Sequence, residues 1–472
     1  MSRATDPQVS FADLAFIEQG IQLEPTLKGI AAFLDTHASL VNGVRRDLVR
    51  GLKKPTTGRQ GVTAPQVLRS LILMRVKHWD YRELRERIAD GYTLRSFTQF
   101  DSQRVPKHDA FNRAFNRLTP ATLQAVNDAV IQAAVDLGLE DGTKLRVDTT
   151  VVETDIHHPT DNTLLWDSVR VLTRLVGQLN DLLPAGVGAF TNRTRVARRR
   201  MQEIQRMTAR ERHTQQVPTY RALIDIAAQV VQGARAVVAR TKRPRGSLMT
   251  RLAVEAVQRE ITRHCGLGDR VISQARRRVL LGEQVPTEDK LYSIFETHTD
   301  LIKRGKVLKP IEFGHKVFLA ESANGLITQY RVLTGNPADQ IHVTPSLERH
   351  TKSFGQAPDL YSSDRGFFNE ANLEACQTAG VKVTCIPQSG GTRSAEREAF
   401  EKSPAFKKGQ RFRAGIEGRI SVLFRGRGMK RALVEGRERF ELLVGAAVLA
   451  NNLMAIAARL GRKQARRRRP AA

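Results

Sequence analysis

The sequence feature that most constrains the fold is a change of hydrophobic period near residue 144. Over residues 144–152, apolar or β-branched residues alternate with mostly polar ones, which is the two-residue period of a β-strand. Asp148 stands in the middle of this segment, although aspartate is depleted from strand interiors. A carboxylate at such a position either caps a local feature or has a chemical role, and the residue types alone leave both interpretations open.

The chain before this strand has the three- and four-residue spacing of amphipathic helices. Thr63 with Pro65, and Asp80 with Glu83, are typical helix starts, so residues 60–140 are predicted to form a compact set of short helices. This pattern suits a helical DNA-binding domain, although an ordinary solvated helical surface has the same composition. The basic residues that decorate these helices are Arg69, Arg82, Arg85, Arg87, Arg104, Lys107, Arg113 and Arg117.

After the strand, at about residues 160–290, long helical segments return with dense arginine. Such density is self-repulsive unless a polyanion lies beside it, so we interpret this region as a helical insertion that contacts nucleic acid. A solvated helical hairpin is the alternative. Trp166, near its start, is either a core anchor or a surface on which a base stacks. The candidate DNA contacts in this region are Arg198, Arg199 and Arg200.

Further strands are predicted downstream of the insertion. Asn324-Gly325 between two apolar alternations is a strong hairpin signal. A strand, helix and strand unit at about 360–386 predicts a parallel pair, and Asp364 would stand at the carboxyl end of its first strand, where open α/β sheets bind ligands. The remaining predicted elements are strands at 291–297, 316–319 and 327–333 and a helix at 339–352.

The C-terminal part is predicted to contain a basic loop followed by two helices. The loop is expected to extend to Gln410, and the next helix, about 411–425, carries Glu417 on the flank of its apolar stripe. Gly415 and Gly418 would allow a close approach beside it. A last apolar helix is expected to cover the sheet, ahead of a disordered basic tail.

Charge and composition favour a soluble nucleic-acid-binding protein. The chain has 76 Lys and Arg against 48 Asp and Glu, a net charge of +28, and nucleic acid is the commonest soluble polyanion. The N-terminus lacks the pattern of a signal peptide, and the apolar run 442–450 is too short to span a bilayer, so a cytoplasmic, nucleoid-associated protein with no membrane partner is expected. The three cysteines show no disulfide or zinc spacing.

Three acids are the candidate catalytic residues and metal ligands. Asp148 and Asp364 are placed on predicted strands and Glu417 on a following helix. Their carboxylate oxygens are the type of ligand that a pair of Mg²⁺ ions needs. Two such ions can hold the attacking and leaving oxygens of a phosphodiester displacement. We expect Mn²⁺ to substitute for Mg²⁺.

The segments 146–154, 363–367 and 413–421 resemble the three acid motifs of bacterial insertion-sequence DDE transposases, and most closely the heterogeneous ISNCY group. The resemblance extends over about residues 60–460. It implies an α/β, RNase H-like mixed-sheet catalytic core, a helical N-terminal DNA-binding domain and a helical insertion after the first core strand. It also implies hydrolysis at the element's ends and attack of the freed 3′-hydroxyl on target DNA.

The third motif matches only in part. Arg413 fits the arginine that related transposases carry before the glutamate, whereas Gln410 replaces their tyrosine and Phe424 their lysine. Arg413 is therefore carried over as a DNA contact, and Arg425 and Lys430 are candidates for the missing basic group.

The resemblance also predicts organisation and partners. The expected partner is double-stranded DNA, namely element ends and target, bound by a homodimer or higher assembly. A catalytically silent DNA-binding protein derived from a transposase and a free-standing RNase H-like nuclease are the alternatives. The predicted parts are a lead-in and linker (1–60), a DNA-binding domain (61–140), a catalytic domain with its insertion (141–460) and a basic tail (461–472).

Overall fold

The computed structural model describes residues 23–53, 61–242, 246–303 and 310–468. The chain forms two compact units: unit 2 is Asp155–Phe313, and unit 1 is the chain before and after it. The insertion predicted at about 160–290 falls within unit 2. Parts of the predicted lead-in and linker, at 1–22 and 54–60, and the end of the tail, at 469–472, lie outside the described residues.

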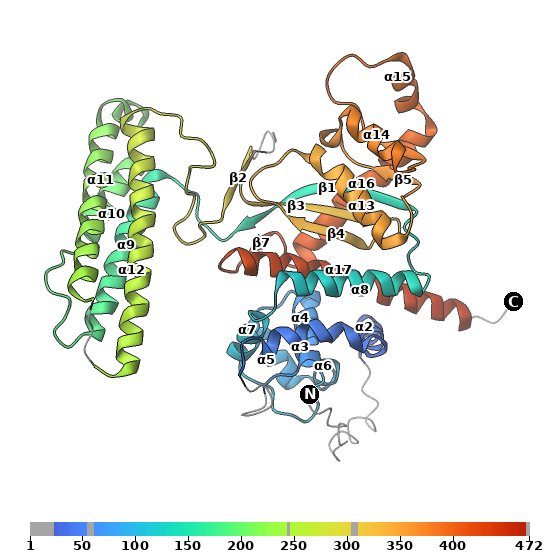
Figure 1. Cartoon of the computed structure of the whole chain (residues 1–472), viewed down its shortest axis with the longest axis horizontal. Helices are drawn as coiled ribbons and strands as arrows, with labels where there is room; N and C mark the ends of the chain where they lie inside the picture. The colour runs from blue at the N-terminus through green and yellow to red at the C-terminus, as the bar shows by residue number, and fades with distance from the viewer. Residues whose placement is uncertain (1–22, 54–60, 243–245, 304–309, 469–472) are drawn as a thin grey trace. The chain divides into compact units, whose positions relative to one another are not determined.

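A mixed β-sheet gives the chain its α/β class, as predicted (Figure 1). In the described residues it has seven strands in the order β2-β3-β1-β5-β6, with β4 paired to β3 and β7 paired to β1. β1 is antiparallel to β3 and parallel to β5, and β6 continues the parallel side. The strands are β1 (Lys144–Thr154), β2 (Asp300–Lys303), β3 (Ile311–Ser322), β4 (Ile327–Val332), β5 (Leu360–Ser362), β6 (Val383–Cys385) and β7 (Arg431–Ala432).

Most strand predictions are confirmed. β1 covers the alternating segment, β3 and β4 form the predicted hairpin, and Gly325 in its turn has the positive φ of +77° that favours glycine. The strand predicted at 291–297 is wrong. There the Gln274 side chain accepts a hydrogen bond from the Leu291 amide at 2.8 Å, and the Ser293 hydroxyl accepts from the Glu296 amide at 3.1 Å, so side chains satisfy this backbone in an irregular path.

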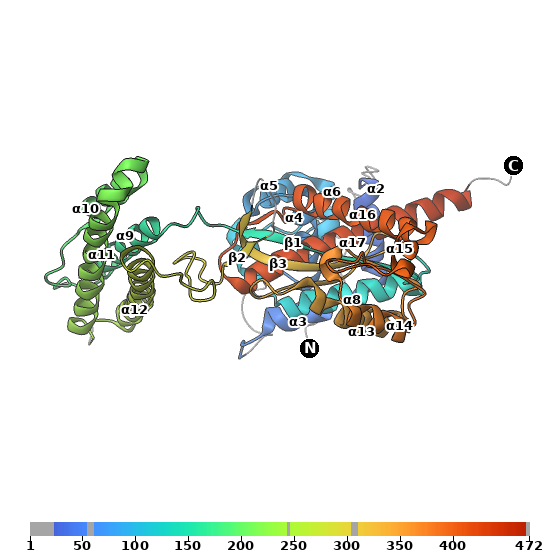
Figure 2. The same cartoon turned by 90° about the horizontal axis from the view of Figure 1, so that it is seen from above.

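Helices cover both faces of the sheet in unit 1 (Figure 2). On one face, α16 and α17 pack against apolar side chains that include Val152 and Leu319. On the other face, α13 and α14 pack against Val147 and Phe318. The elements of this part are η3 (Asp339–His342), α13 (Val343–Phe354), η4 (Arg365–Phe367), α14 (Glu370–Thr378), α15 (Ala395–Lys402), α16 (Pro404–Gly426) and α17 (Arg437–Arg468).

Two C-terminal predictions are wrong. The region expected to be a loop through Gln410 contains α15 and the first turns of α16, because Ser394 and Ser403 cap these helices through their side chains. The basic tail expected to be disordered continues α17 as far as Arg468, the last described residue.

The N-terminal helices share one hydrophobic core with α17. Thr63 forms a capping box with Gln66, and Asp80 accepts from two backbone amides, so both predicted helix starts are confirmed. Buried residues of these helices pack with Leu449 and Leu453 of α17. The elements are α2 (Pro25–Thr36), η1 (Ala38–Leu40), α3 (Val41–Val49), α4 (Ala64–Lys77), α5 (Tyr81–Asp90), α6 (Tyr92–Thr98), α7 (His108–Phe115) and α8 (Pro120–Asp136).

Unit 2 is a bundle of long helices with its own core (Figure 1). Trp166 is half-buried and packs against this core. The helices are α9 (Asp161–Leu182), α10 (Thr194–Arg206), α11 (Ala209–Arg240) and α12 (Leu248–Ala275), followed by η2 (Arg276–Leu280).

Among the described residues, two helices pass a length and composition test for a membrane span, α11 and the 437–463 part of α17. In α17, 78% of the apolar window is buried inside the structure, as in the core helix of a soluble protein. The fold is thus compatible with a soluble protein.

Candidate acidic site and its basic surroundings

The three predicted acids meet around one guanidinium group, that of Arg413 on α16. Its Nη2 lies 3.2 Å from Asp148 Oδ2 and 3.8 Å from Asp364 Oδ2, and its Nη1 lies 2.8 Å from Glu417 Oε1. Asp148 comes from the middle of β1, Asp364 follows the end of β5, and Glu417 lies one helical turn after Arg413. Carboxylates from elements far apart in the sequence thus lie around the same guanidinium group.

The three carboxylates differ in exposure. The Asp148 side chain is 10% exposed, that of Asp364 37% and that of Glu417 64%. Backbone amides fix the two aspartates: the Thr149 amide donates to Asp148 Oδ1 at 2.7 Å, and the Gly366 amide donates to Asp364 Oδ1 at 2.9 Å. Exposure to solvent therefore increases across the site, from the nearly buried acid on the sheet to the acid on the helix surface.

The start of α16 is tied to the strand ends that carry Asp364. The side-chain amide of Gln410 donates to the carbonyls of Ser363 at 3.2 Å and Cys385 at 2.7 Å, and the Ser362 hydroxyl donates to the Gly409 carbonyl at 3.0 Å. A Cβ at Gly409 would collide with the Cys385 sulfur, so only glycine permits this approach. Burial raises the pKa of Cys385 to about 11, which keeps the thiol protonated.

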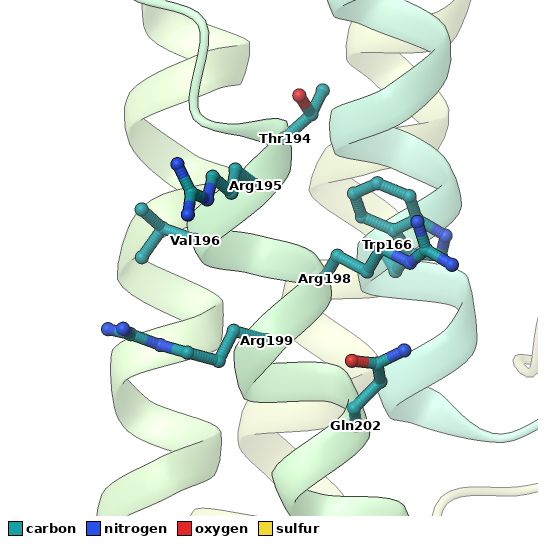
Figure 3. Close-up of a pocket in the computed structure, with 7 residues that line it drawn as sticks. All are labelled: Trp166, Thr194, Arg195, Val196, Arg198, Arg199 and Gln202. Atoms are coloured by element: carbon teal, nitrogen blue, oxygen red, sulfur yellow. The ribbon is translucent and has the colours of Figure 1, made fainter.

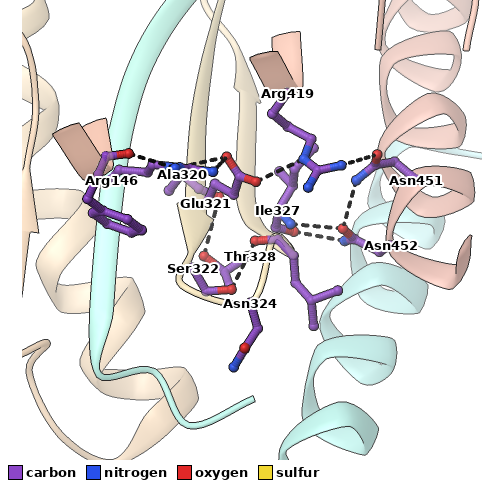
Figure 4. A network of polar contacts seen from close by, with 12 residues as sticks. Arg146, Ala320, Glu321, Ser322, Asn324, Ile327, Thr328, Arg419, Asn451 and Asn452 are labelled. Atoms are coloured by element: carbon purple, nitrogen blue, oxygen red, sulfur yellow. Dashed lines mark hydrogen bonds and ion pairs between the residues drawn. The ribbon is translucent and has the colours of Figure 1, made fainter. Parts of the chain in front are cut away.

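A buried carboxylate anchors the middle of α16 (Figure 4). Glu321 on β3 is fully buried and pairs with two arginines, Arg146 Nε at 2.8 Å and Arg419 Nε at 2.8 Å. Arg146 also donates to the Phe412 carbonyl at 2.6 Å, next to Arg413. Arg419 follows Glu417 on the same helix, so Glu321 holds α16 from both sides of the acidic site.

Of the two glycines predicted to allow close approach, only one does so. A Cβ at Gly415 would collide with the Arg146 guanidinium, whereas Gly418 faces open space. The prediction for Gly418 is wrong because the helix turns that position away from the sheet.

Sequence reasoning missed two supporting acids. Glu321 is the penultimate residue of β3 and lies beyond the strand predicted at 316–319, so the rule that singled out Asp148 does not reach it. Asp339, on η3, accepts from the Thr149 hydroxyl at 2.9 Å and pairs with Lys316 at 2.8 Å. It thereby links β1, β3 and η3 beside the acidic site, and no sequence signal identifies a contact of this kind.

The donor chemistry of the site fits a hard divalent cation, because all three side chains offer carboxylate oxygen. Within the described ranges, no group of three or more His, Cys, Asp or Glu side chains stands ready to hold a metal directly. Here the acids contact Arg413 instead, so a positive charge already lies where the carboxylates converge.

The predicted DNA-binding residues lie in both units. Arg425 hydrogen-bonds the Ser421 hydroxyl through Nε at 3.0 Å, and the Lys430 side chain is exposed. Arg413 faces the three acids. On α10, Arg199 and Arg200 pair with Glu203 at 3.7 Å and 2.7 Å, while Arg195 and Arg198 are exposed.

Several of the α10 arginines line a hollow in unit 2 of about 580 Å³ (Figure 3). Trp166 of α9 lines it as well, together with Thr194 and Gln202. The half-buried indole thus packs against the core and also borders the hollow. Among the described residues, the arginines that line the hollow are Arg195, Arg198 and Arg199.

No family model, no curated protein and no solved structure matches this chain. The residues and the geometry of the site are therefore the evidence for its function.

Proposed function

We propose that the protein is a DNA transposase of the DDE type, in which Asp148, Asp364 and Glu417 hold two Mg²⁺ ions. The observation that carries the proposal is the convergence of these three acids on Arg413, within 3.8 Å of one guanidinium group. The mixed sheet adds support for an RNase H-like core, because β1 has an antiparallel neighbour on one side and a parallel neighbour on the other.

In this proposal the metal ions, when bound, stabilise the charge that develops on the attacking and leaving oxygens of a phosphodiester displacement. The protein's residues position that reaction. The amides of Thr149 and Gly366 orient the two aspartates, and the Glu321 network fixes α16, which carries the third acid. Glu417 is the most exposed of the three, so DNA would enter from its side.

The basic surface of α10 supports a DNA-binding role for unit 2. Arg195 and Arg198 are exposed, and duplex DNA gains affinity from each phosphate that an arginine neutralises. The high net charge of +28 agrees with this role. Joining two element ends to a target requires both ends in one complex, so we propose a homodimer or larger assembly on DNA.

The test is an assay of Mg²⁺-dependent cleavage and joining, with duplexes taken from the DNA that flanks the gene on both sides. The variants Asp148→Asn, Asp364→Asn and Glu417→Gln should abolish products while DNA binding persists. Asp359→Asn is the matched control, because Asp359 is half-exposed and pairs with Lys382 at 2.9 Å. Full activity of any of the three acid variants would refute the assigned triad.

The second candidate is a catalytically silent DNA-binding protein. The ion pairs that Arg413 makes with all three acids favour it, because they give the acids a cationic partner without a metal. Salt-sensitive DNA binding by the wild type with no metal-dependent product would support this candidate. Hydrolysis of any duplex, without preference for the flanking sequences, would instead indicate a free-standing nuclease.

A further inference from the structure

One cation in the acidic site is supplied by the protein itself. Arg413 contacts a carboxylate oxygen of each acid, at 3.2 Å, 3.8 Å and 2.8 Å, and its side chain is only 19% exposed. Three carboxylates so close together repel one another, and in this arrangement Arg413 is the positive charge that they share.

Arg413 leaves one of its hydrogen-bond donors unsatisfied in the arrangement with the three acids. Its Nε is buried and has no hydrogen-bond partner among the described residues, a state that the Nε atoms of Arg75, Arg117, Arg331 and Arg427 share. Arg146 provides the contrast: its Nε donates to Glu321 at 2.8 Å and its Nη1 to the Phe412 carbonyl at 2.6 Å. An unsatisfied buried donor lowers the stability of the position that Arg413 occupies.

Arg413 is also placed so that it can leave without a change in the backbone. It lies on α16 four residues before Glu417, on the flank of the helix, and its long side chain can rotate toward the exposed end of the site where Glu417 is 64% exposed. Asp148 and Asp364 are held by backbone amides and stay where they are.

We propose that Arg413 and divalent metal ions compete for the same three carboxylates, so that Arg413 holds the metal-free site together and is displaced when the ions bind. This inference rests on the proposed function, since it takes the triad to be the metal site. Once displaced, the guanidinium is available for a DNA phosphate, so metal loading and DNA contact are coupled through one side chain.

The test measures Mn²⁺ binding to the full-length protein in the absence of DNA, by titration with detection of free Mn²⁺ by electron paramagnetic resonance. Competition requires that Arg413→Gln bind Mn²⁺ about tenfold more tightly than the wild type, a difference of about 1.4 kcal/mol. Arg411→Gln is the matched control, because Arg411 is an exposed residue of the same helix and the variant loses the same charge. Its affinity should stay within about twofold of the wild type.

The acid variants separate failure of this inference from failure of the proposed function. Asp148→Asn should weaken Mn²⁺ binding in both the wild-type and the Arg413→Gln background. If it does so while Arg413→Gln binds no more tightly than the wild type, competition is refuted and the metal site stands. If Asp148→Asn leaves Mn²⁺ binding unchanged, the triad is not the metal site, and both proposals fail. Circular dichroism of each variant confirms that it is folded.

Discussion

Replacing Glu321 with glutamine should loosen α16 and leave unit 2 unchanged. Glu321 is fully buried, and its two oxygens each accept from an arginine at 2.8 Å. Removing one member of a buried ion pair typically costs about 3 to 5 kcal/mol, because the remaining charge loses its partner. Arg146 and Arg419 are 13% and 24% exposed and keep the Phe412 carbonyl and Asn451 as acceptors, so we expect the low end, about 3 kcal/mol.

Native-state hydrogen exchange followed by mass spectrometry measures this effect element by element. Local openings exchange amides at a rate set by their free energy, so about 3 kcal/mol predicts roughly 100-fold faster exchange in α16. Peptides of α11 and α12 in unit 2 provide the internal reference, because unit 2 has a separate core.

Glu441→Gln is the matched control for the same chemical change at a partly exposed ion pair. Glu441 pairs with Arg437 at 2.6 Å and is 31% exposed, so its loss should cost less than about 1 kcal/mol. Exchange in α16 that is unchanged in Glu321→Gln, or a Glu441→Gln effect of equal size, would show that Glu321 does not anchor the helix.

Three further outcomes are expected. Burial lowers the pKa of His350 to about 4, so unfolding takes up a proton at this residue between about pH 6.5 and 4, and its contribution should lower stability by roughly 3 kcal/mol as pH drops through this window. Burial also lowers the pKa of His342 to about 4, so His350→Asn should reduce the slope of stability against pH in urea denaturation without removing it. Burial raises the pKa of all three cysteines to about 11, so the native protein should react slowly with a thiol reagent and the urea-unfolded protein quickly; rapid native labelling would contradict this. In Arg195→Gln/Arg198→Gln, the slope of log affinity for duplex DNA against log salt should decrease by about 0.9 for each lost phosphate contact, and an unchanged slope would exclude α10 from the DNA interface.

The sequence predicts the local elements well where the hydrophobic period agrees with the turn and capping residues that begin or end an element. The alternation around Asp148, the Asn324-Gly325 turn and the Asp80 cap each depend on neighbouring residues, and all three were confirmed. The failures involved partners distant in sequence. Leu291 was assigned to a strand because nothing nearby shows that the Gln274 side chain binds its backbone.

In the candidate site, too, local features could be predicted from the sequence and contacts between distant residues could not. Residue types, their places on predicted strands and a helix, and the resemblance of three motifs were enough to choose Asp148, Asp364 and Glu417. They do not predict the contact that joins these acids. Arg413 was expected to bind DNA, whereas in the described conformation it faces the acids, because only the folded chain places α16 beside β1 and β5. Similarly, Glu321 gains its importance from arginines far from it in the chain.

The pairing of β1 with β3 has a consequence for folding kinetics. Glu153 and Gly314 are partners in the sheet, although all of unit 2 lies between them in the sequence. A flexible loop of that length is roughly five doublings longer than a tight turn of a few residues. Closing it therefore costs about 3 kcal/mol more in chain entropy. A unit 2 that folds first holds its own two ends together and removes most of that entropy loss before β1 meets β3. The insertion would then set the rate at which the central strands pair, and substitutions in its core should slow formation of a sheet to which they do not belong.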